Sequence, residues 1–249
     1  MLHNAGGHLP FVRQCRTKGA HFLRFISSIG AVMTDFSTAR RHMVDGQVRT
    51  ADVTDLRVIT AMQEVPRERF VPPSATALAY LDLDLTVGEG GSRRLLKPMV
   101  LAKMIHAADL AGTDRVLDVG CATGYAAAVL AQIAGEVVAL EEDAGLGAMA
   151  QKALTGLPNV SVVSGPLTAG WPAGAPYDVI LIEGATEVEP QAFCAQLKDG
   201  GRLVCVLGSG PDTKAMLYRR SGGEMGGRPI FDARAAVLPG FRKTPVFAF

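Results

Sequence analysis

The chain has 249 residues, of which 48% are hydrophobic, enough to bury one sizeable globular core. Its formal net charge of +1 gives no global field for nucleic acid, and no apolar run of about 18 residues predicts a membrane span. The four cysteines are scattered without a C-x-x-C pair, which indicates free thiols in a reducing cytosol and no metal site. We therefore expect a cytoplasmic protein without nucleic acid, membrane or metal partners.

Three segments are distinguished by composition and pattern. Residues 1–34 are basic and contain no acid, and Arg24 interrupts their only apolar stretch, which argues against a signal peptide. We expect either a disordered extension or an upstream start with Met33 as the true first residue. Residues 35–110 are expected to form an N-terminal helical lobe with an acceptor loop, and residues 111–249 a cofactor-binding core.

Capping residues and prolines mark the helices of the lobe. Ser37 can cap a helix that runs through about Gln47, and Thr54 can cap a second amphipathic helix. Pro98 is suited to begin a third helix through about Leu110, because its fixed φ matches the first helical position.

From residue 111 onward, short apolar runs alternate with helix-like segments. Strands are predicted at 115–119, 136–141, 160–164, 178–182 and 202–207, and helices at 124–134, 143–155 and 190–198. A helix or strand is expected at 213–220, followed by strands near 227–237. Such alternation is typical of an α/β fold with a doubly wound, mostly parallel sheet that binds ligand at the carboxyl ends of its strands.

A glycine turn joins the first of these strands to its helix. The apolar strand that contains Asp118 breaks into Gly120 and Gly124, which allow a tight reversal and a close ligand approach. The next strand ends in Glu141, 23 residues after Asp118, where a carboxylate of a βαβ unit hydrogen-bonds ribose hydroxyls. The spacing predicts a nucleoside site.

The acid inside the first strand narrows the choice of nucleoside. The pattern Asp118-x-Gly120-x-Ala122-x-Gly124 departs from the dinucleotide fingerprint, in which pyrophosphate lies on the helix N-terminus. A carboxylate at Asp118 would repel pyrophosphate but would attract a cationic amino-acid moiety. S-adenosylmethionine carries an ammonium and a positively charged sulfur, and it is the cofactor that we predict.

Several blocks of sequence resemble the protein-L-isoaspartate O-methyltransferase family, whose members repair isomerised aspartates with S-adenosylmethionine. They include Val-Pro-Arg-Glu-Arg-Phe-Val-Pro at 65–72, which is fairly specific to that family, and the glycine turn. Further blocks lie at 79–82, 170–178 and 196–204, so that the resemblance runs from about Val44 to Pro239. It implies a Rossmann-like S-adenosylmethionine-dependent methyltransferase fold with an N-terminal helical lobe.

The resemblance also implies a cofactor site, in which Glu141 binds the ribose and Leu167 lies against adenine. Pro166 stands where the family usually has an aspartate, so recognition of the base is weakened or falls to the backbone. Tyr125 is a candidate contact for the methionine part of the cofactor. The predicted cofactor-binding residues are Asp118, Gly120, Cys121, Ala122, Gly124, Tyr125, Glu141, Glu142, Pro166, Leu167 and Glu183.

The acceptor loop departs from the family pattern. Counting back from Pro98, Leu96 replaces the serine and Arg94 the threonine of a G-Q-T-I-S-Q-P-like segment. Glu183 stands where the family has another threonine. These changes argue against isoaspartate repair by an unmodified mechanism.

Charged residues are the candidates for the acceptor side. We hypothesise that Arg93, Arg94 and Lys97 draw in an anionic acceptor; the alternative is a solvated basic loop. Glu183 either orients the cofactor or acceptor, acts as a base for a protonated acceptor, or caps the following helix. No catalytic base is assigned, because a carboxylate acceptor is already ionised at neutral pH.

The leading hypothesis is an O-methyltransferase that acts on a carboxylate, namely isoaspartyl residues in proteins. The acceptor could be a protein, a peptide or a small carboxylate. The alternatives are a methyltransferase for a different acceptor and a catalytically inactive module that binds S-adenosylmethionine. The oligomeric state is left open.

Overall fold

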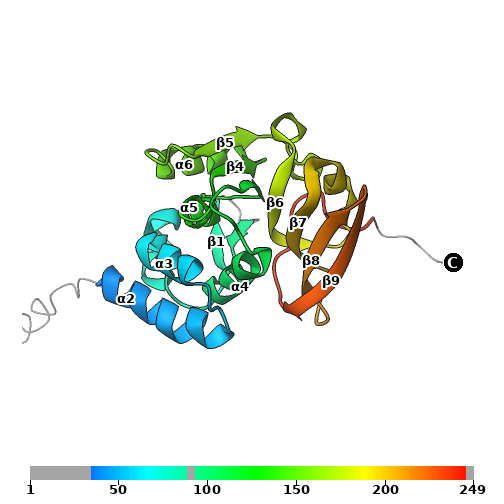
Figure 1. The fold of residues 1–249 in the computed structure, drawn as a ribbon. Coiled ribbons are helices and arrows are strands. Elements are labelled where there is room, and N and C mark those ends of the chain that lie inside the picture. The colour runs from blue at the N-terminus through cyan, green and yellow to red at the C-terminus, as the bar shows by residue number, and fades with distance from the viewer. Residues whose placement is uncertain (1–34, 89–92, 245–249) are drawn as a thin grey trace, which may run out of the picture. The chain divides into compact units, whose positions relative to one another are not determined.

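The computed structural model describes residues 35–88 and 93–244, and the expectations for residues 1–34 lie outside them. Within the described residues, seven strands form one sheet in the order β5-β4-β3-β6-β7-β8-β9 (Figure 1). The strands are β3 (Arg115–Val119), β4 (Glu136–Glu141), β5 (Val160–Ser164), β6 (Tyr177–Thr186), β7 (Leu197–Leu207), β8 (Lys214–Ser221) and β9 (Glu224–Asp232). The first five are parallel and the last two antiparallel. The predicted α/β class and mostly parallel sheet are confirmed.

The two faces of the sheet are covered differently. Helices α4 (Pro98–Ala108), α5 (Tyr125–Ala131) and α6 (Ala144–Ala153) share one hydrophobic core with the first face. On the second face, the core is closed by short 3-10 segments, η6 (Leu167–Ala169) and η8 (Gln191–Gln196). The prediction of a helix at 190–198 was therefore wrong in type, because the chain makes only six residues of 3-10 helix before β7 begins.

The N-terminal lobe contains α2 (Phe36–Met43) and α3 (Leu56–Glu64), with a π-helical turn and 3-10 turns between and after them. Aspartates cap both helices, rather than the predicted Ser37 and Thr54. Asp35 accepts the Ser37 amide at 3.0 Å, and Asp55 accepts the Arg57 amide at 2.8 Å. An ionised carboxylate satisfies these orphan amides and also complements the helix dipole.

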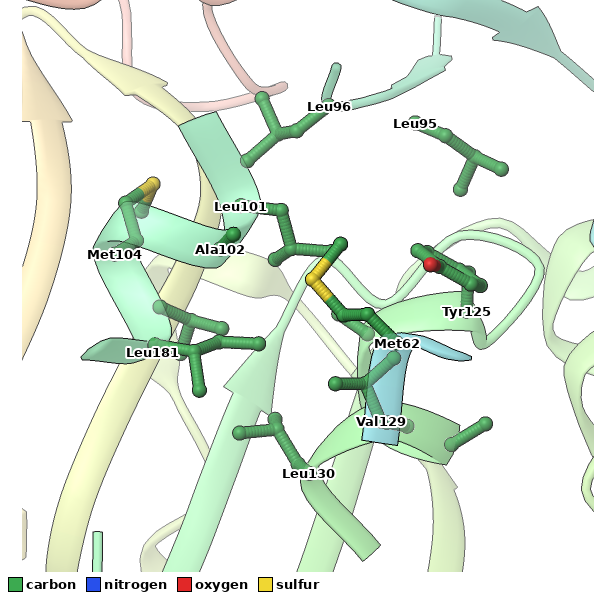
Figure 2. Close-up of a cluster of buried hydrophobic side chains, with 14 of the residues drawn as sticks. Met62, Leu95, Leu96, Leu101, Ala102, Met104, Tyr125, Val129, Leu130 and Leu181 are labelled. Carbon is green, nitrogen blue, oxygen red and sulfur yellow. The ribbon is translucent and has the colours of Figure 1, made fainter. Parts of the chain in front are cut away.

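The hydrophobic core runs without a break from the lobe to the sheet. Figure 2 shows Met62 of α3 beside Leu101 of α4 and Val129 of α5. Leu95 and Leu96 of the acceptor segment lie in the same cluster, with 1% and 2% of their surfaces exposed. The residues from Asp35 onward accordingly form one compact unit.

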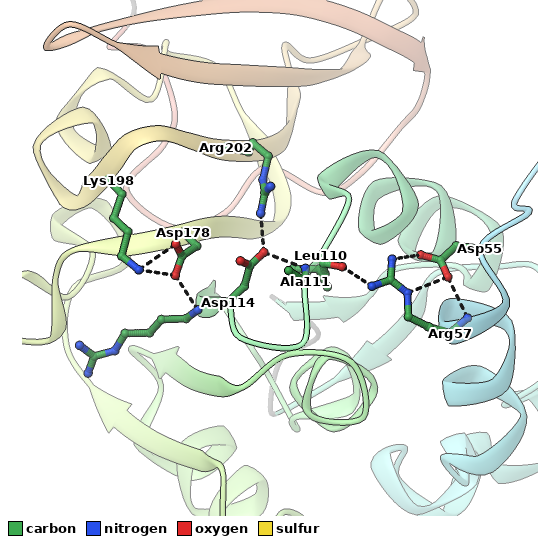
Figure 3. A network of polar contacts seen from close by, with 9 residues as sticks. Asp55, Arg57, Leu110, Ala111, Asp114, Asp178, Lys198 and Arg202 are labelled. Carbon is green, nitrogen blue, oxygen red and sulfur yellow. Dashed lines mark hydrogen bonds and ion pairs between the residues drawn. The ribbon is translucent and has the colours of Figure 1, made fainter.

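Charged side chains link the lobe and the strands at the end of the sheet where β3 and β6 begin (Figure 3). Asp178 accepts the Arg115 amide at 2.8 Å and pairs with Lys198 at 2.7 Å. On the lobe side of the network, Asp55 pairs with Arg57, whose guanidinium also binds the Leu110 carbonyl. The acidic groups Asp178 and Asp55 at this end of the sheet thus each have a cationic partner.

A hairpin carries the acceptor segment to the core. Its strands β1 (Leu85–Val87) and β2 (Arg93–Leu95) are antiparallel, and β2 leads directly into α4. Within the residues that the structure describes, no helix is both long and apolar enough to cross a membrane.

One buried arginine fastens this segment to the lobe. Arg67 has no exposed surface, and its Nε and Nη2 donate to the carbonyls of Ala79 and Leu96 at 2.9 and 2.8 Å. Its guanidinium lies 4.5 Å from the centre of the Tyr125 ring. Burial lowers the pKa of Arg67, but its ordinary value is so high that the group remains charged.

We expect Arg67→Ala to lower the free energy of unfolding by about 3 kcal/mol or more, because two buried carbonyls lose their donor and a cavity opens. Urea denaturation measures this change. Arg69→Ala is the matched control, since Arg69 is exposed on the same turn and a surface change should stay within about 0.5 kcal/mol. Equal losses in the two variants would contradict the assignment.

Candidate functional site

Three carboxylates gather at the carboxyl ends of neighbouring parallel strands. Asp118 lies on β3, Glu141 ends β4 and Glu183 lies on β6, with 0%, 0% and 3% of their surfaces exposed. The pairing of β3 with both β4 and β6 brings the three strand ends to one edge of the sheet. Buried acids are costly unless they are paired, hydrogen-bonded or protonated, and each of these three meets that cost differently.

The glycine turn forms the floor of the site as predicted. Gly120 and Gly124 have φ of 81° and 92°, which side chains rarely adopt. A Cβ at Gly124 would lie 2.8 Å from Leu154 Cδ1, and one at Gly120 would lie 3.0 Å from Arg93 Nη2. Ala122 also has a positive φ, of 50°, and its amide donates to Glu141. The turn is therefore held in a conformation that directs the Ala122 amide to Glu141 and the Gly120 carbonyl to Arg93.

Glu141 is the most heavily hydrogen-bonded acid of the site. Its Oε2 accepts the Ala122 amide at 2.8 Å. Its Oε1 accepts the amides of Glu142 and Asp143, both at 3.0 Å, and Arg93 Nη1 at 2.6 Å. Hydrogen bonds from an arginine and from backbone amides to a carboxylate are among the stronger ones in proteins.

Arg93 lies inside the site rather than in a solvated loop. Only 3% of its side chain is exposed, and its Nη2 donates to the Gly120 carbonyl at 2.7 Å. The alternative of a solvated basic loop is therefore wrong for Arg93, and attraction of an anionic acceptor by this residue stays a prediction. Arg94 is exposed and Lys97 is half-buried, so these two remain candidates for the acceptor side.

Asp118 and Glu183 form a pair of carboxyls that cannot both be ionised cheaply. Burial raises the pKa of Asp118 to about 7, and neither of its oxygens has a hydrogen-bond partner among the described residues. Burial, and after it the charge of Asp118, raises the pKa of Glu183 well above its usual value. Both carboxyls therefore favour their neutral forms more than a solvent-exposed acid does.

The position of Glu183 excludes one of its three interpretations. It lies within β6, which continues to Thr186, so it does not cap a helix and that interpretation was wrong. The two other interpretations, that Glu183 orients a cofactor or acceptor or acts as a base for a protonated acceptor, stay predictions.

Cys121 and Tyr125 are buried but do not face an open site. Burial raises the pKa of the Cys121 thiol well above its usual value, so the residue fills space and is no nucleophile. The Tyr125 ring packs edge-on against Phe70, with 5.6 Å between ring centres, and under Arg67. The Tyr125 ring thus packs toward the helical lobe, and its contact with the methionine part of the cofactor stays a prediction.

The segment at Pro166 and Leu167, which is expected beside adenine, contacts a carboxylate from the neighbouring strand end. Leu167 is fully buried in the core of the second face, and its amide donates to Glu142 Oε2 at 3.2 Å. Pro166 before it is exposed. Glu142, from the end of the neighbouring strand, therefore supplies a carboxylate near the position where the family pattern has an aspartate.

Sequence reasoning missed Leu238, which closes the site from the C-terminal side. Its amide donates to the Ala185 carbonyl at 3.0 Å, and the Ala236 carbonyl accepts the Ala185 amide at 2.9 Å. A Cβ at Gly184 would lie only 2.6 Å from Leu238 Cγ. Because this segment is irregular, no hydrophobic periodicity marks it; the small residue at Gly184 was the one available signal.

The donors and acceptors of the site fit a cationic nucleoside. The Asp118 oxygens and Glu183 Oε1 are buried without hydrogen-bond partners among the described residues, as expected of groups that await a ligand. The Gly120 carbonyl and the Glu141 carboxylate lie beside them and are bridged by Arg93. An ammonium and a pair of ribose hydroxyls would match these acceptors.

Comparison with known proteins gives one consistent result. A family model described as protein-L-isoaspartate(D-aspartate) O-methyltransferase matches residues 38–233. The chain is 40% identical over 214 residues to protein-L-isoaspartate O-methyltransferase 1 of Rhodopseudomonas palustris (strain HaA2), covering 83% of this chain and 85% of the relative. It is 43% identical over 173 residues to protein-L-isoaspartate O-methyltransferase 2 of Shewanella sediminis (strain HAW-EB3), covering 69% and 70%.

Solved structures are similar over most of the chain. A protein-L-isoaspartate O-methyltransferase superposes with a TM-score of 0.70 at 25% identity, over 81% of this chain and 66% of that one. A putative protein-L-isoaspartate O-methyltransferase from Plasmodium falciparum, in complex with S-adenosyl-L-homocysteine, gives a TM-score of 0.69 over 80% and 97% of the two chains. At 15% identity, this second likeness concerns the fold alone.

We expect Asp118→Asn to stabilise the ligand-free chain, more at pH 8 than at pH 5. The pKa of Asp118 is about 7 in the folded chain against an ordinary 3.8, so folding takes up a proton between these values. Stability is therefore lost as pH rises through that window, and asparagine avoids the loss. The gain should be about 2 kcal/mol larger at pH 8.

Urea denaturation of both proteins at the two pH values measures this difference. Asp178→Asn is the control, because Asp178 lies at the other end of β6 and its pKa is lowered by the Arg115 amide and Lys198 in spite of desolvation. That variant should lose stability. A gain in stability from Asp118→Asn that is the same at both pH values would contradict the raised pKa of Asp118.

Proposed function

Since the chain belongs to the protein-L-isoaspartate(D-aspartate) O-methyltransferase family, we propose that it methylates the carboxylate of isoaspartyl residues in proteins and peptides. Enzymes of this class depend on S-adenosylmethionine, and so does this chain. Family membership over residues 38–233 carries the proposal, and it does not favour a different acceptor or an inactive module.

The three-carboxylate edge is the proposed cofactor site. Asp118 and the Gly120 carbonyl would hold the ammonium of the methionine part, and Glu141 the ribose hydroxyls. Glu142 and Leu167 lie at the end of the site where the base would be. When bound, S-adenosylmethionine supplies a methyl group on a sulfonium, whose positive charge the buried acids favour.

The chain's part in the reaction is positioning and exclusion of water. An isoaspartyl carboxylate is ionised at neutral pH, so it attacks without a general base. Holding it in line and stripping its water beside a positive charge supply the acceleration. Leu238 is a buried apolar side chain packed against Gly120 and Gly184, suited to excluding water but not to hydrogen-bonding an acceptor.

The acceptor peptide is proposed to lie along the acceptor segment. A groove of about 370 Å³ lies there, and Lys97 lines it together with Lys214 and Arg234. Asp212 and Asp232 also line it, and Asp232 pairs with Lys214 at 2.7 Å, which leaves a positive excess. An isoaspartyl acceptor is an anion, so this charge favours its approach.

The proposal extends to the arrangement and location of the chain. Residues 35–110 would form the lobe that meets the acceptor, and residues 111–249 the core that binds the cofactor. A protein that repairs other proteins would act in the cytoplasm, where free thiols such as Cys121 and Cys205 stay reduced.

We expect the purified chain to transfer labelled methyl groups from S-adenosylmethionine to an isoaspartyl peptide but not to its aspartyl twin. The label should be base-labile, as a methyl ester is. Asp118→Asn should lower kcat/KM by at least about 100-fold, because the cation then loses its buried acid. Asp178→Asn should keep a rate near that of the parent chain, since Asp178 lies at the opposite end of the sheet.

Two results would be decisive against the proposal. No label on the isoaspartyl peptide, with S-adenosyl-L-homocysteine binding confirmed by calorimetry, would refute the acceptor but keep the cofactor site. Equal labelling of both peptides would refute the specificity.

A further inference from the structure

Arg93 donates hydrogen bonds to two of the acceptor groups that the proposed cofactor site needs. Its Nη1 lies 2.6 Å from Glu141 Oε1, and its Nη2 lies 2.7 Å from the Gly120 carbonyl oxygen. The first of these acceptors is assigned to ribose and the second to the ammonium of the cofactor. The guanidinium therefore lies where a cationic nucleoside would bind.

This contact is unusually well buried. The side chains of Arg93 and Glu141 are 3% and 0% exposed, whereas every other ion pair between described residues has both partners at least 11% exposed. An arginine fork bound to a desolvated carboxylate is a strong interaction, and removing one partner strands the other. Arg93 is thus an integral occupant of the site in the ligand-free chain.

Glu141 cannot serve both partners at once. Its Oε1 already accepts three N–H groups, and its Oε2 accepts the Ala122 amide. Two carboxylate oxygens offer about four acceptor positions in all, so ribose hydroxyls can bind only if a donor leaves. Three of the four donors are backbone amides fixed by the glycine turn and the end of β4. Arg93 is the one side chain among them, and it can leave by rotation.

We propose that Arg93 is an internal competitor of S-adenosylmethionine, which must displace the guanidinium from Glu141 and Gly120 in order to bind. The proposal rests on the cofactor site assigned under the proposed function. One cation then replaces another in a site lined by Asp118, Glu141 and Glu183, so the acids are compensated both before and after the exchange.

The position of Arg93 in the chain gives the competition a consequence. Arg93 begins β2, where it pairs with Val87, and the acceptor segment follows directly in Arg94–Lys97. Displacing the guanidinium removes the tie between this segment and the cofactor site. The apparent affinity for the cofactor is the intrinsic affinity multiplied by the fraction of molecules in which Arg93 has left Glu141. Cofactor binding in turn releases the acceptor segment.

Calorimetric titration with S-adenosyl-L-homocysteine tests the competition without relying on turnover. Arg93→Met removes the competing cation while keeping much of its apolar length. We expect it to bind S-adenosyl-L-homocysteine on the order of tenfold more tightly than the parent chain, the change that corresponds to one charge-assisted hydrogen bond. Arg115→Met is the matched control, because Arg115 is a strand arginine paired with Glu136 at 3.0 Å on the surface; its affinity should be unchanged.

Each outcome bears on the proposal. Weaker or equal binding by Arg93→Met, with binding by the parent chain intact, overturns the competition and leaves the proposed function standing. Failure of the parent chain and of Arg93→Met to bind overturns the cofactor site and the competition together. If Arg93→Met binds S-adenosyl-L-homocysteine and the parent chain does not, the competition is supported, and Arg93 then blocks the site fully in the parent chain.

A second measurement serves if Arg93→Met fails to fold, since that variant leaves Glu141 without its cation. Nuclear magnetic resonance of the parent chain, labelled with ¹⁵N-arginine, follows the Nε–H of Arg93, which is buried without an acceptor among the described residues. The signal is assigned by its loss in Arg93→Lys. Saturation with S-adenosyl-L-homocysteine should bring its hydrogen exchange to the rate of a solvated arginine; unchanged protection overturns the displacement.

Discussion

The burial of three acids at one edge of the sheet is the constraint on which the site depends. Parallel pairing of β3 with β4 and β6 places Asp118, Glu141 and Glu183 together, out of contact with water. Their charge is compensated in three ways: Glu141 receives backbone amides, Arg93 supplies a cation, and burial raises the pKa of both Asp118 and Glu183. The same burial prepares the site for a cationic ligand, because a charge that is poorly solvated gains most from a partner.

A second buried cation organises the opposite side of the acceptor segment. Arg67 holds the Leu96 carbonyl from the lobe, while Arg93 holds Glu141 and Gly120 from the hairpin. The acceptor segment is thereby fastened to the helical lobe at Leu96, and at Arg93 to the edge of the sheet that carries the three acids. Since Arg67 stacks on Tyr125, the first residue of α5, the lobe is also fixed to the helix that follows the glycine turn.

Features that depend on local chemistry could be predicted from the sequence, and features that depend on distant packing could not. The glycine turn and Glu141 follow from spacing alone, because the βαβ geometry permits few alternatives. The helix caps were misassigned by one or two residues, since Asp35 and Asp55 compete with neighbouring hydroxyls for the same amides. The inward rotation of Arg93, the lobe-facing Tyr125 and the closure by Leu238 have no local signal: each is determined by contacts across at least 27 residues of chain, as in the bond from Arg93 to Gly120.

The departure from the family pattern at Glu183 is best considered together with the charge of Arg93. A glutamate in place of a threonine adds a third acid to a buried pair, which alone would raise the cost of ionising any of them. Arg93 offsets this cost: its charge lowers the pKa of both Asp118 and Glu183, although burial outweighs that effect. A threonine at 183 would leave Arg93 facing two acids, and a neutral residue at 93 would leave three acids without a cation. The charges of Glu183 and Arg93 are therefore coupled, and the hairpin that carries Arg93 is part of the charge balance of the proposed cofactor site.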